Sequence, residues 1–257
     1  MRRTGTPPRH AIDISEADGV RYLHFGSEWV QGAMRVARPW SLELDYTREM
    51  MAGLLLRDAA RWPRTALLIG LGAGSLAKFI HRHFPACRIT VVEINPQVEF
   101  VARQYFRLPD DPLRLDVRIG CGADYLQTNK RRFDLILSDG FDAGGRPGML
   151  DTPAFYQTCR AGLSDDGLFC VNLLREKGFA SSVDRIRSAF TDRIAVFPAC
   201  ASGNTIVFGR GENGVEATLG ELAARAAELR ARTRLNLLPT VDRLRQAGIS
   251  DAAPLRL

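Results

Sequence analysis

The sequence predicts an α/β protein with a doubly wound, mostly parallel sheet and a small antiparallel β domain at its N-terminus. From residue 65 onward, short apolar runs such as "TALLIGLGAGS", "RITVVEINP" and "FDLILSDG" alternate with segments of helical period. Runs that are apolar on both faces are typical of parallel strands covered by helices on both sides. Residues 11–36 instead contain strand-like runs separated by the turn signals "ADG" and "GSE", which predict two to four antiparallel strands.

The order of these elements predicts three parts of the chain. Residues 1–43 form the N-terminal β-hairpin domain, with residues 1–10 expected to be disordered. Residues 44–215 begin with a helix over 44–57 and continue as the α/β domain, which closes with a pair of strands. Residues 216–257 are rich in alanine and arginine and predict a peripheral helical extension.

Composition argues against several other classes of protein. The net charge is +6, from 35 basic and 29 acidic residues, but the arginines are interspersed with acids, so we expect no nucleic-acid partner. The five cysteines show no CxxC spacing, which argues against a disulfide framework and against a metal site. No apolar run reaches the ~18 residues of a membrane span, and no signal peptide is recognisable, so we expect a cytoplasmic protein without a membrane partner.

A glycine-rich loop follows the first apolar strand of the α/β domain. Gly70, Gly72 and Gly74 lie between that strand and a helix, and Glu93 ends the next strand. Glycines let the backbone approach a ligand closely, and a carboxylate at that strand end can accept hydrogen bonds from both hydroxyls of a ribose. The spacing GxGxG favours an S-adenosyl nucleoside over a dinucleotide, and with it the Rossmann-like fold of S-adenosylmethionine-dependent methyltransferases. The alternative is a tight turn beside a capped strand end.

Further polar residues follow other strands of the same predicted sheet. Cys121, Gly122 and Asp124 come after the third strand, and Asp139 and Asp142 follow the buried strand "FDLIL". Because ligands of open parallel sheets bind outside the carboxyl ends of the strands, these residues are expected to converge on one cleft. The alternative for the two aspartates is that they only cap a turn.

The order of motifs resembles that of the polyamine aminopropyltransferases, the spermidine synthase family. The resemblance covers roughly residues 20–210. The segments that carry it are "WVQGAM", "YTREMMAGLLL", "LLIGLGAGSLAKF", "VVEINPQV", "IGCGADYL", "FDLILSDGFD", "FYQTCRAGLSDDGLFCVNL" and "SGNTIVF". The N-terminal Gln-Gly hairpin and the acidic DxxD loop distinguish this combination from ordinary methyltransferases.

The resemblance implies an activity and a set of residue roles. The family transfers an aminopropyl group from decarboxylated S-adenosylmethionine to a polyamine such as putrescine, without a metal. Asp139 matches the aspartate proposed as general base, and Asp142 matches the acid that holds the cationic amine. Gln31 matches a substrate-binding glutamine that contacts the nucleoside, Glu93 matches the ribose-binding acid, and Ser202–Gly203 matches a late serine-glycine turn.

Four positions depart from the family pattern. Ala73 replaces the aspartate that binds the amino group of the donor, and Cys121 replaces an acid near the adenine, where Asp124 is a possible substitute. Ala143 replaces the proline after the second acid. Tyr46 and Thr47 share the place of the family's helix tyrosine. Tyr46 is expected to bind the substrate, although counting back from "EMM" assigns that place to Thr47.

These departures leave two alternatives to aminopropyl transfer. A methyltransferase that uses S-adenosylmethionine itself is favoured by Ala73, because no carboxylate then demands a decarboxylated donor. A non-catalytic nucleoside-binding homologue is the other alternative. The small N-terminal sheet is expected to pack against a second subunit, which predicts a homodimer.

Overall fold

A computed structural model of the chain describes residues 12–26, 29–57, 62–140, 148–175 and 178–257. The disorder predicted for residues 1–10 and the predicted acid Asp142 both lie outside these described residues.

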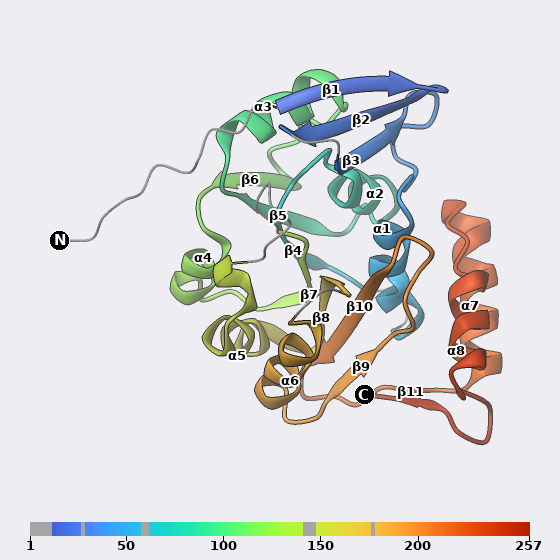
Figure 1. Ribbon diagram of the computed structural model, residues 1–257. Coiled ribbons are helices and arrows are strands. Elements are labelled where there is room, and N and C mark those ends of the chain that lie inside the picture. Colours follow the sequence, from blue (N-terminus) through green and yellow to red (C-terminus); the bar gives the residue numbers. More distant parts are fainter. Residues whose placement is uncertain (1–11, 27–28, 58–61, 141–147, 176–177) are drawn as a thin grey trace.

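A seven-stranded sheet forms the centre of the molecule (Figure 1). Its spatial order is β6-β5-β4-β7-β8-β10-β9. The strands are β4 (Thr65–Ile69), β5 (Arg88–Glu93), β6 (Leu115–Ile119), β7 (Phe133–Ser138), β8 (Leu163–Leu174), β9 (Ile194–Val196) and β10 (Asn204–Arg210). Strands β4 to β8 pair in parallel, whereas β10 is antiparallel to both β8 and β9. The predicted doubly wound, mostly parallel sheet is therefore confirmed, and its order reverses between β4 and β7.

Helices cover both faces of this sheet, because alternate strand residues point to opposite sides. Leu68 and Leu137 belong to a core with the helices α1 (Asp45–Met50), η1 (Met51–Leu55), α2 (Ser75–His83) and α3 (Pro96–Tyr105). Leu67 and Ile136 belong to a second core with α4 (Gly122–Thr128), α5 (Pro153–Ala161) and α6 (Phe179–Ala189). A short turn, η2 (Gly148–Asp151), precedes α5.

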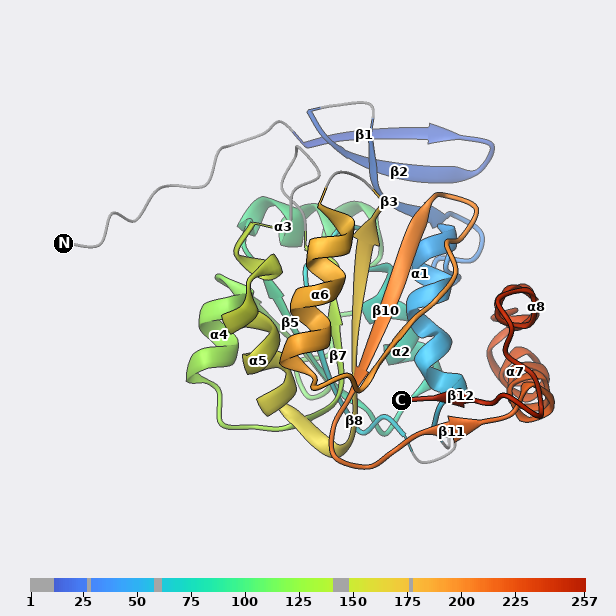
Figure 2. The same cartoon turned by 60° about the horizontal axis from the view of Figure 1, so that its bottom comes forward.

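The N-terminal sheet has three antiparallel strands in the order β1-β2-β3. They are β1 (Ile12–Ala17), β2 (Val20–Phe25) and β3 (Val30–Arg35). Figure 2 shows this sheet lying across one end of the central sheet. Its inner side chains Leu23 and Met34 are fully buried against Ala73, Val101 and Phe106 of the same chain. The sheet therefore already packs on its own α/β domain.

The C-terminal part is helical, as predicted, with α7 (Leu219–Thr233) and α8 (Leu238–Gln246). The short strands β11 (Glu216–Ala217) and β12 (Leu255–Arg256) pair beside these helices. The extension is less peripheral than expected, because its apolar face belongs to the core that also holds α1 and η1. The buried residues involved are Leu222, Ala226, Leu229, Leu235, Leu237, Val241 and Leu244. No helix in the described ranges has the length and apolar character needed to cross a membrane.

Candidate functional site

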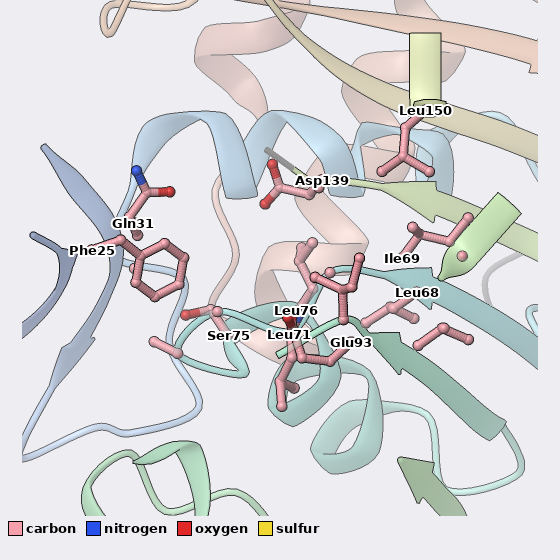
Figure 3. A pocket seen from close by; sticks show the side chains of 18 of the residues that line it. Phe25, Gln31, Leu68, Ile69, Leu71, Ser75, Leu76, Glu93, Asp139 and Leu150 are labelled. Atoms are coloured by element: carbon pink, nitrogen blue, oxygen red, sulfur yellow. Dashed lines mark hydrogen bonds between the residues drawn. The ribbon is translucent and has the colours of Figure 1, made fainter. Parts of the chain in front are cut away.

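A cavity of about 310 Å³ lies at the carboxyl ends of β4, β5 and β7, beneath the N-terminal sheet. In Figure 3, Phe25 and Gln31 reach it from the N-terminal strands, and Asp139 and Glu93 enter from different strands of the central sheet. The polar side chains of its wall are Gln31, Tyr46, Thr47, Ser75, Glu93, Cys121 and Asp139. The predicted convergence of the strand ends on one cleft therefore holds for most of these positions.

The three glycines of the loop after β4 have different places. Gly70 and Gly72 line the cavity with positive φ values of 93° and 50°. A side chain on Gly70 would begin 2.5 Å from the carbonyl oxygen of Asp139, so glycine is required where β4 passes β7. Gly74, with φ 68°, is the residue that leads into α2, and it is not part of the cavity wall. Its role is to turn the chain into α2.

Glu93 is a buried carboxylate at the end of β5, with 7% of its surface exposed. One oxygen accepts a hydrogen bond from the backbone N–H of Leu71 at 2.8 Å, and the other accepts one from Asn95 at 2.9 Å. Burial raises the pKa of Glu93, and these backbone hydrogen bonds oppose that rise. Each carboxylate oxygen retains lone-pair capacity toward the cavity, as a pair of ribose hydroxyls requires.

The segment after β6 contributes only in part. Cys121 and Gly122 line the cavity, and a side chain on Gly122 would begin 2.4 Å from Ile69 Cγ2. Asp124 is exposed on α4 and is not among the residues of the cavity wall. The expectation that Asp124 stands in for the acid replaced by Cys121 therefore gains no support from its position.

Asp139 follows β7 and is fixed by both backbone and side-chain contacts. Its N–H donates to the carbonyl oxygen of Ile69 at 2.9 Å. Asn172 Nδ2 donates to Asp139 Oδ1 at 3.0 Å, and the hydroxyl of Tyr46 is close enough to the same carboxylate to lower its pKa. Burial raises the pKa of Asp139, while both side-chain hydrogen bonds act to lower it. The result is a desolvated carboxylate in a fixed orientation, which suits a proton acceptor.

The residue of α1 that meets Asp139 is Tyr46. Burial and the neighbouring carboxylate of Asp139 raise the pKa of Tyr46 well above its usual value, so its hydroxyl stays protonated as a donor. Thr47, in contrast, donates its hydroxyl to the backbone oxygen of Leu44 at 2.6 Å. Counting along the sequence assigned the place of the family's tyrosine to Thr47. In the structure, the side chain next to Asp139 is that of Tyr46.

A second cavity, of about 480 Å³, adjoins the first. The two share Gln31, Tyr46 and Asp139 in their walls. The second also contains the acids Glu43 and Asp45, which form ion pairs with Arg35 and Arg48 respectively. Among the described residues of this wall, the charged side chains are the carboxylates of Glu43, Asp45 and Asp139. They favour a cationic occupant, with the charge of the first two partly offset by their arginines.

Sequence reasoning missed two amides in the wall of this second cavity. Asn204 Nδ2 donates to Asn172 Oδ1 at 2.9 Å, and Ser202 Oγ donates to Asn204 Oδ1 at 2.8 Å. These bonds continue the hydrogen-bonded chain that begins at Asp139. The only sequence signal for Asn172 is a lone polar residue in the apolar run "LFCVNLL". Ser202, which was expected from the resemblance, lies at the end of this chain.

Ala73 leaves the first cavity without a carboxylate at the loop position where the family has one. Ala73 lines the cavity and is only 2% exposed, because Gly32 of β3 packs directly against it. Among the described residues of this wall, the carboxylates are Glu93 and Asp139. No group of three or more His, Cys, Asp or Glu side chains within the described residues is arranged to hold a metal ion.

Comparison with known proteins agrees with this geometry. The family model of the spermine/spermidine synthase domain matches residues 44–197. The chain belongs to this family. A polyamine aminopropyltransferase of Chromobacterium violaceum is 36% identical over 245 residues, which are 95% of this chain and 93% of the relative. A protein of the same name from Neisseria meningitidis serogroup B is 36% identical over 219 residues, covering 85% of this chain and 82% of its own length.

Solved structures show that the fold of this chain is shared by proteins outside its own family. A probable spermidine synthase from Corynebacterium glutamicum superposes with a TM-score of 0.73 at 21% identity, covering 90% of this chain and 87% of that one. Human methyltransferase-like protein 13 in complex with SAH superposes with a TM-score of 0.65 at 26% identity, covering 74% of this chain and 93% of that one. The methyltransferase-like α/β fold is thus confirmed.

Proposed function

We propose that the protein is an aminopropyltransferase that moves an aminopropyl group from decarboxylated S-adenosylmethionine to a polyamine such as putrescine. The observation that carries this proposal is the pair of adjoining cavities that share Asp139, Tyr46 and Gln31. A nucleoside donor occupies the first cavity and an amine the second, so that the reacting groups meet at Asp139. The names of the family and of the two bacterial relatives support the same reaction.

The site supplies what this transfer needs. An alkyl ammonium must lose a proton before its nitrogen can attack, and Asp139 accepts that proton. The nitrogen then forms a bond to the carbon next to the sulfonium sulfur, while the carbon–sulfur bond breaks and its electrons return to sulfur. The sulfonium thereby leaves as a neutral thioether, methylthioadenosine. The protein needs no metal in this scheme, because the donor carries its own leaving group.

The remaining residues hold the two substrates. Glu93 binds the ribose, Gly70 and Gly72 let the backbone approach the nucleoside, and Cys121 and Gly122 face the base. In the second cavity, Gln31 and Tyr46 flank the amine. Asp142 lies outside the described residues, and its role as the second acid that attracts the amine rests on the resemblance to the family. Gly74 and Asp124 were also expected to bind the nucleoside. Neither lines the first cavity, so we propose no contact with the nucleoside for them.

A second candidate is a methyltransferase that uses intact S-adenosylmethionine. Ala73 favours it, because a carboxylate that would hold the donor's ammonium is missing at that position. Loss of one charge-assisted hydrogen bond costs about 1.5–3 kcal/mol, which would weaken selection for the decarboxylated donor. A non-catalytic nucleoside-binding homologue is the third reading. We expect a cytoplasmic homodimer that engages neither nucleic acid nor a membrane.

Titration with three nucleosides, followed by a product assay, separates these functions. The purified protein is titrated by calorimetry with decarboxylated S-adenosylmethionine, intact S-adenosylmethionine and methylthioadenosine, and then incubated with each donor and putrescine. Tighter binding of the decarboxylated donor and release of methylthioadenosine with spermidine are expected. Methyl transfer from the intact donor would establish the second candidate. Nucleoside binding without turnover of any amine would favour the third.

A further inference from the structure

The helix that presents Tyr46 to Asp139 is short and has weak local support. Helix α1 spans Asp45–Met50, and Leu44 at its N-cap provides no side-chain hydrogen bond. A helix of six residues has too few internal hydrogen bonds to be stable by itself. Its position must therefore come from contacts with other parts of the chain.

The C-terminal helices supply such contacts on the outer side of α1 (Figures 1 and 2). Glu49, one turn beyond Tyr46, has a side chain that is 9% exposed and forms an ion pair with Arg243 of α8. Thr240 Oγ1, one turn before Arg243, donates to Glu49 Oε1 at 2.9 Å. Among the described residues, every side chain that donates a hydrogen bond to this carboxylate belongs to α8.

Two further contacts extend this attachment along the same element. Arg225 of α7 donates to the carbonyl oxygen of Leu55, at the end of η1, at 2.9 Å. Val241 and Leu244 of α8 are buried in one core with Met50 of α1. The polar contacts add directional restraints to the apolar packing of α1, because hydrogen bonds depend on orientation whereas apolar burial does not.

The matched family domain ends at residue 197, so the contacts from α7 and α8 come from outside it. Thr240 and Arg243 lie on one face of α8 because residues three apart on a helix are neighbours. Tyr46 is the α1 residue that shares the walls of both cavities with Asp139, and its hydroxyl lowers the pKa of that carboxylate. A small rotation of α1 would separate that hydroxyl from the carboxylate, and displacements of ~1 Å at a reacting group can cost up to ~100-fold in rate.

We propose that Glu49, Thr240 and Arg243 are positioning residues, which act across the C-terminal helices to hold Tyr46 against Asp139. None of the three lines either cavity. The inference about rate rests on the proposed amine transfer, whereas the placement of Tyr46 is a property of the fold and can be measured separately.

The kinetic test is a double-mutant cycle. Arg243→Met should lower kcat for the amine about tenfold in the wild-type background, and by less than about twofold in Tyr46→Phe, because a residue that acts through Tyr46 has nothing further to lose. Arg243→Lys should recover part of the rate. Arg245→Met is the matched control, since Arg245 is on the same helix and, within the described ranges, its ion pair is with the exposed Asp242. Equal losses in both backgrounds would overturn the proposal.

A spectroscopic test does not depend on turnover. The chain has five tyrosines, so 3-fluorotyrosine labelling gives a small set of ¹⁹F resonances, and Tyr46→Phe identifies that of Tyr46. This resonance should move in Arg243→Met and in the near-isosteric Thr240→Val, and stay in place in Arg245→Met. An unmoved resonance in a folded Thr240→Val and Arg243→Met would refute the positioning role. A protein that turns over no amine but shows the shift would contradict only the proposed function.

Discussion

At the scale of single residues, the site depends on how two carboxylates are held. Glu93 is fixed by backbone N–H groups, while Asp139 is fixed by the side chains of Asn172 and Tyr46. Backbone donors are independent of side-chain identity, so Glu93 suits constant recognition of a ribose. Side-chain donors can be removed one at a time, so the environment of Asp139 can be tested residue by residue.

Replacing Asp139 with asparagine removes the proposed proton acceptor and keeps its size. We expect kcat to fall by about 10²–10⁴-fold, the usual range for loss of a general base. Affinity for methylthioadenosine should change little, because Glu93 and the glycine loop remain. Steady-state kinetics with putrescine, beside a calorimetric titration, measure both quantities. Asp142→Asn is the comparison, and should mainly raise KM for the amine. Full activity in Asp139→Asn would exclude the acid–base role.

Removing the hydroxyl of Tyr46 should change the pH profile. The hydrogen bond from Tyr46 lowers the pKa of Asp139, so Tyr46→Phe should raise that pKa further above its ordinary value. A base must be deprotonated to act, so the acid limb of kcat/KM should move to higher pH. Activity lost at low pH should be recovered as pH rises. An acid limb at the wild-type position would mean that Asp139 does not set it.

Glu93→Gln keeps the shape of the ribose-binding residue but removes its charge. A hydrogen bond to a charged group contributes about 1.5–3 kcal/mol, so nucleoside affinity should fall at least about tenfold. Calorimetry with methylthioadenosine measures this loss. The melting temperature of the ligand-free protein should fall modestly as well, because both oxygens of Glu93 accept backbone N–H groups and the amide nitrogen of glutamine can accept neither. Unchanged affinity would remove Glu93 from the ribose site.

At the scale of elements, the sequence predicted contacts that are local in the chain and missed those set by strand register or helix rotation. The strand–glycine loop–helix unit and Glu93 belong to consecutive elements, so their order was sufficient. Asn172 and Asn204 meet only because β10 pairs antiparallel with β8, with Ile206 opposite Asn172. Their hydrogen bond is a diagonal cross-strand contact, and no local pattern specifies it.

Contacts between distant parts of the chain also decide which residue of α1 faces the cavity and what the C-terminal helices cover. Which of Tyr46 and Thr47 faces the cavity depends on the rotation of α1, and one residue of a helix corresponds to roughly 100°. That rotation is set in part by Arg243, which lies 194 residues away from Glu49 in the sequence. A helical period identified α7 and α8 as helices, but could not show what their apolar faces cover.

Strand β3 is coupled to the glycine loop through Gly32. A side chain at this position would begin 2.7 Å from Ala73 Cβ and 2.8 Å from the Ala73 nitrogen. We therefore expect Gly32→Val to push β3 and the neighbouring Gln31 away from the loop. Nucleoside affinity and the melting temperature should both fall. Gly220→Ala in α7 is the control, and should be neutral or slightly stabilising. Wild-type affinity in Gly32→Val would show that β3 moves independently of the cavity.

At the scale of the whole molecule, both cavities are built from parts that are distant in the sequence. The N-terminal sheet contributes Gln31, α1 contributes Tyr46, and the central sheet contributes Asp139. The C-terminal helices reinforce α1 from outside. One described chain supplies all three of these side chains, and a second subunit is not needed for any of them. What remains open to assembly is the outer edge of the N-terminal sheet.

The edge strand β1 is the surface through which we expect the predicted homodimer to form. A need of the N-terminal sheet for support by a second subunit is no longer the reason for expecting it. The N-terminal sheet packs on its own chain through Leu23 and Met34, so it does not require a partner for support. However, among the described strands β1 pairs with β2 alone, its residues 13–17 are exposed, and Ile14 is 37% exposed. Such an edge can pair with the same edge of a second copy about a twofold axis.

Light scattering tests this contact directly. The full chain should run at twice its 28.5 kDa mass. Ile14→Lys places like charges near the axis and should shift the protein toward monomer without lowering its melting temperature, because the side chain is outside the core. Val196→Lys is the matched control on β9, the exposed edge of the central sheet, and should stay dimeric. A monomeric wild type would reject the dimer, and dissociation by Val196→Lys alone would move the interface from β1 to β9.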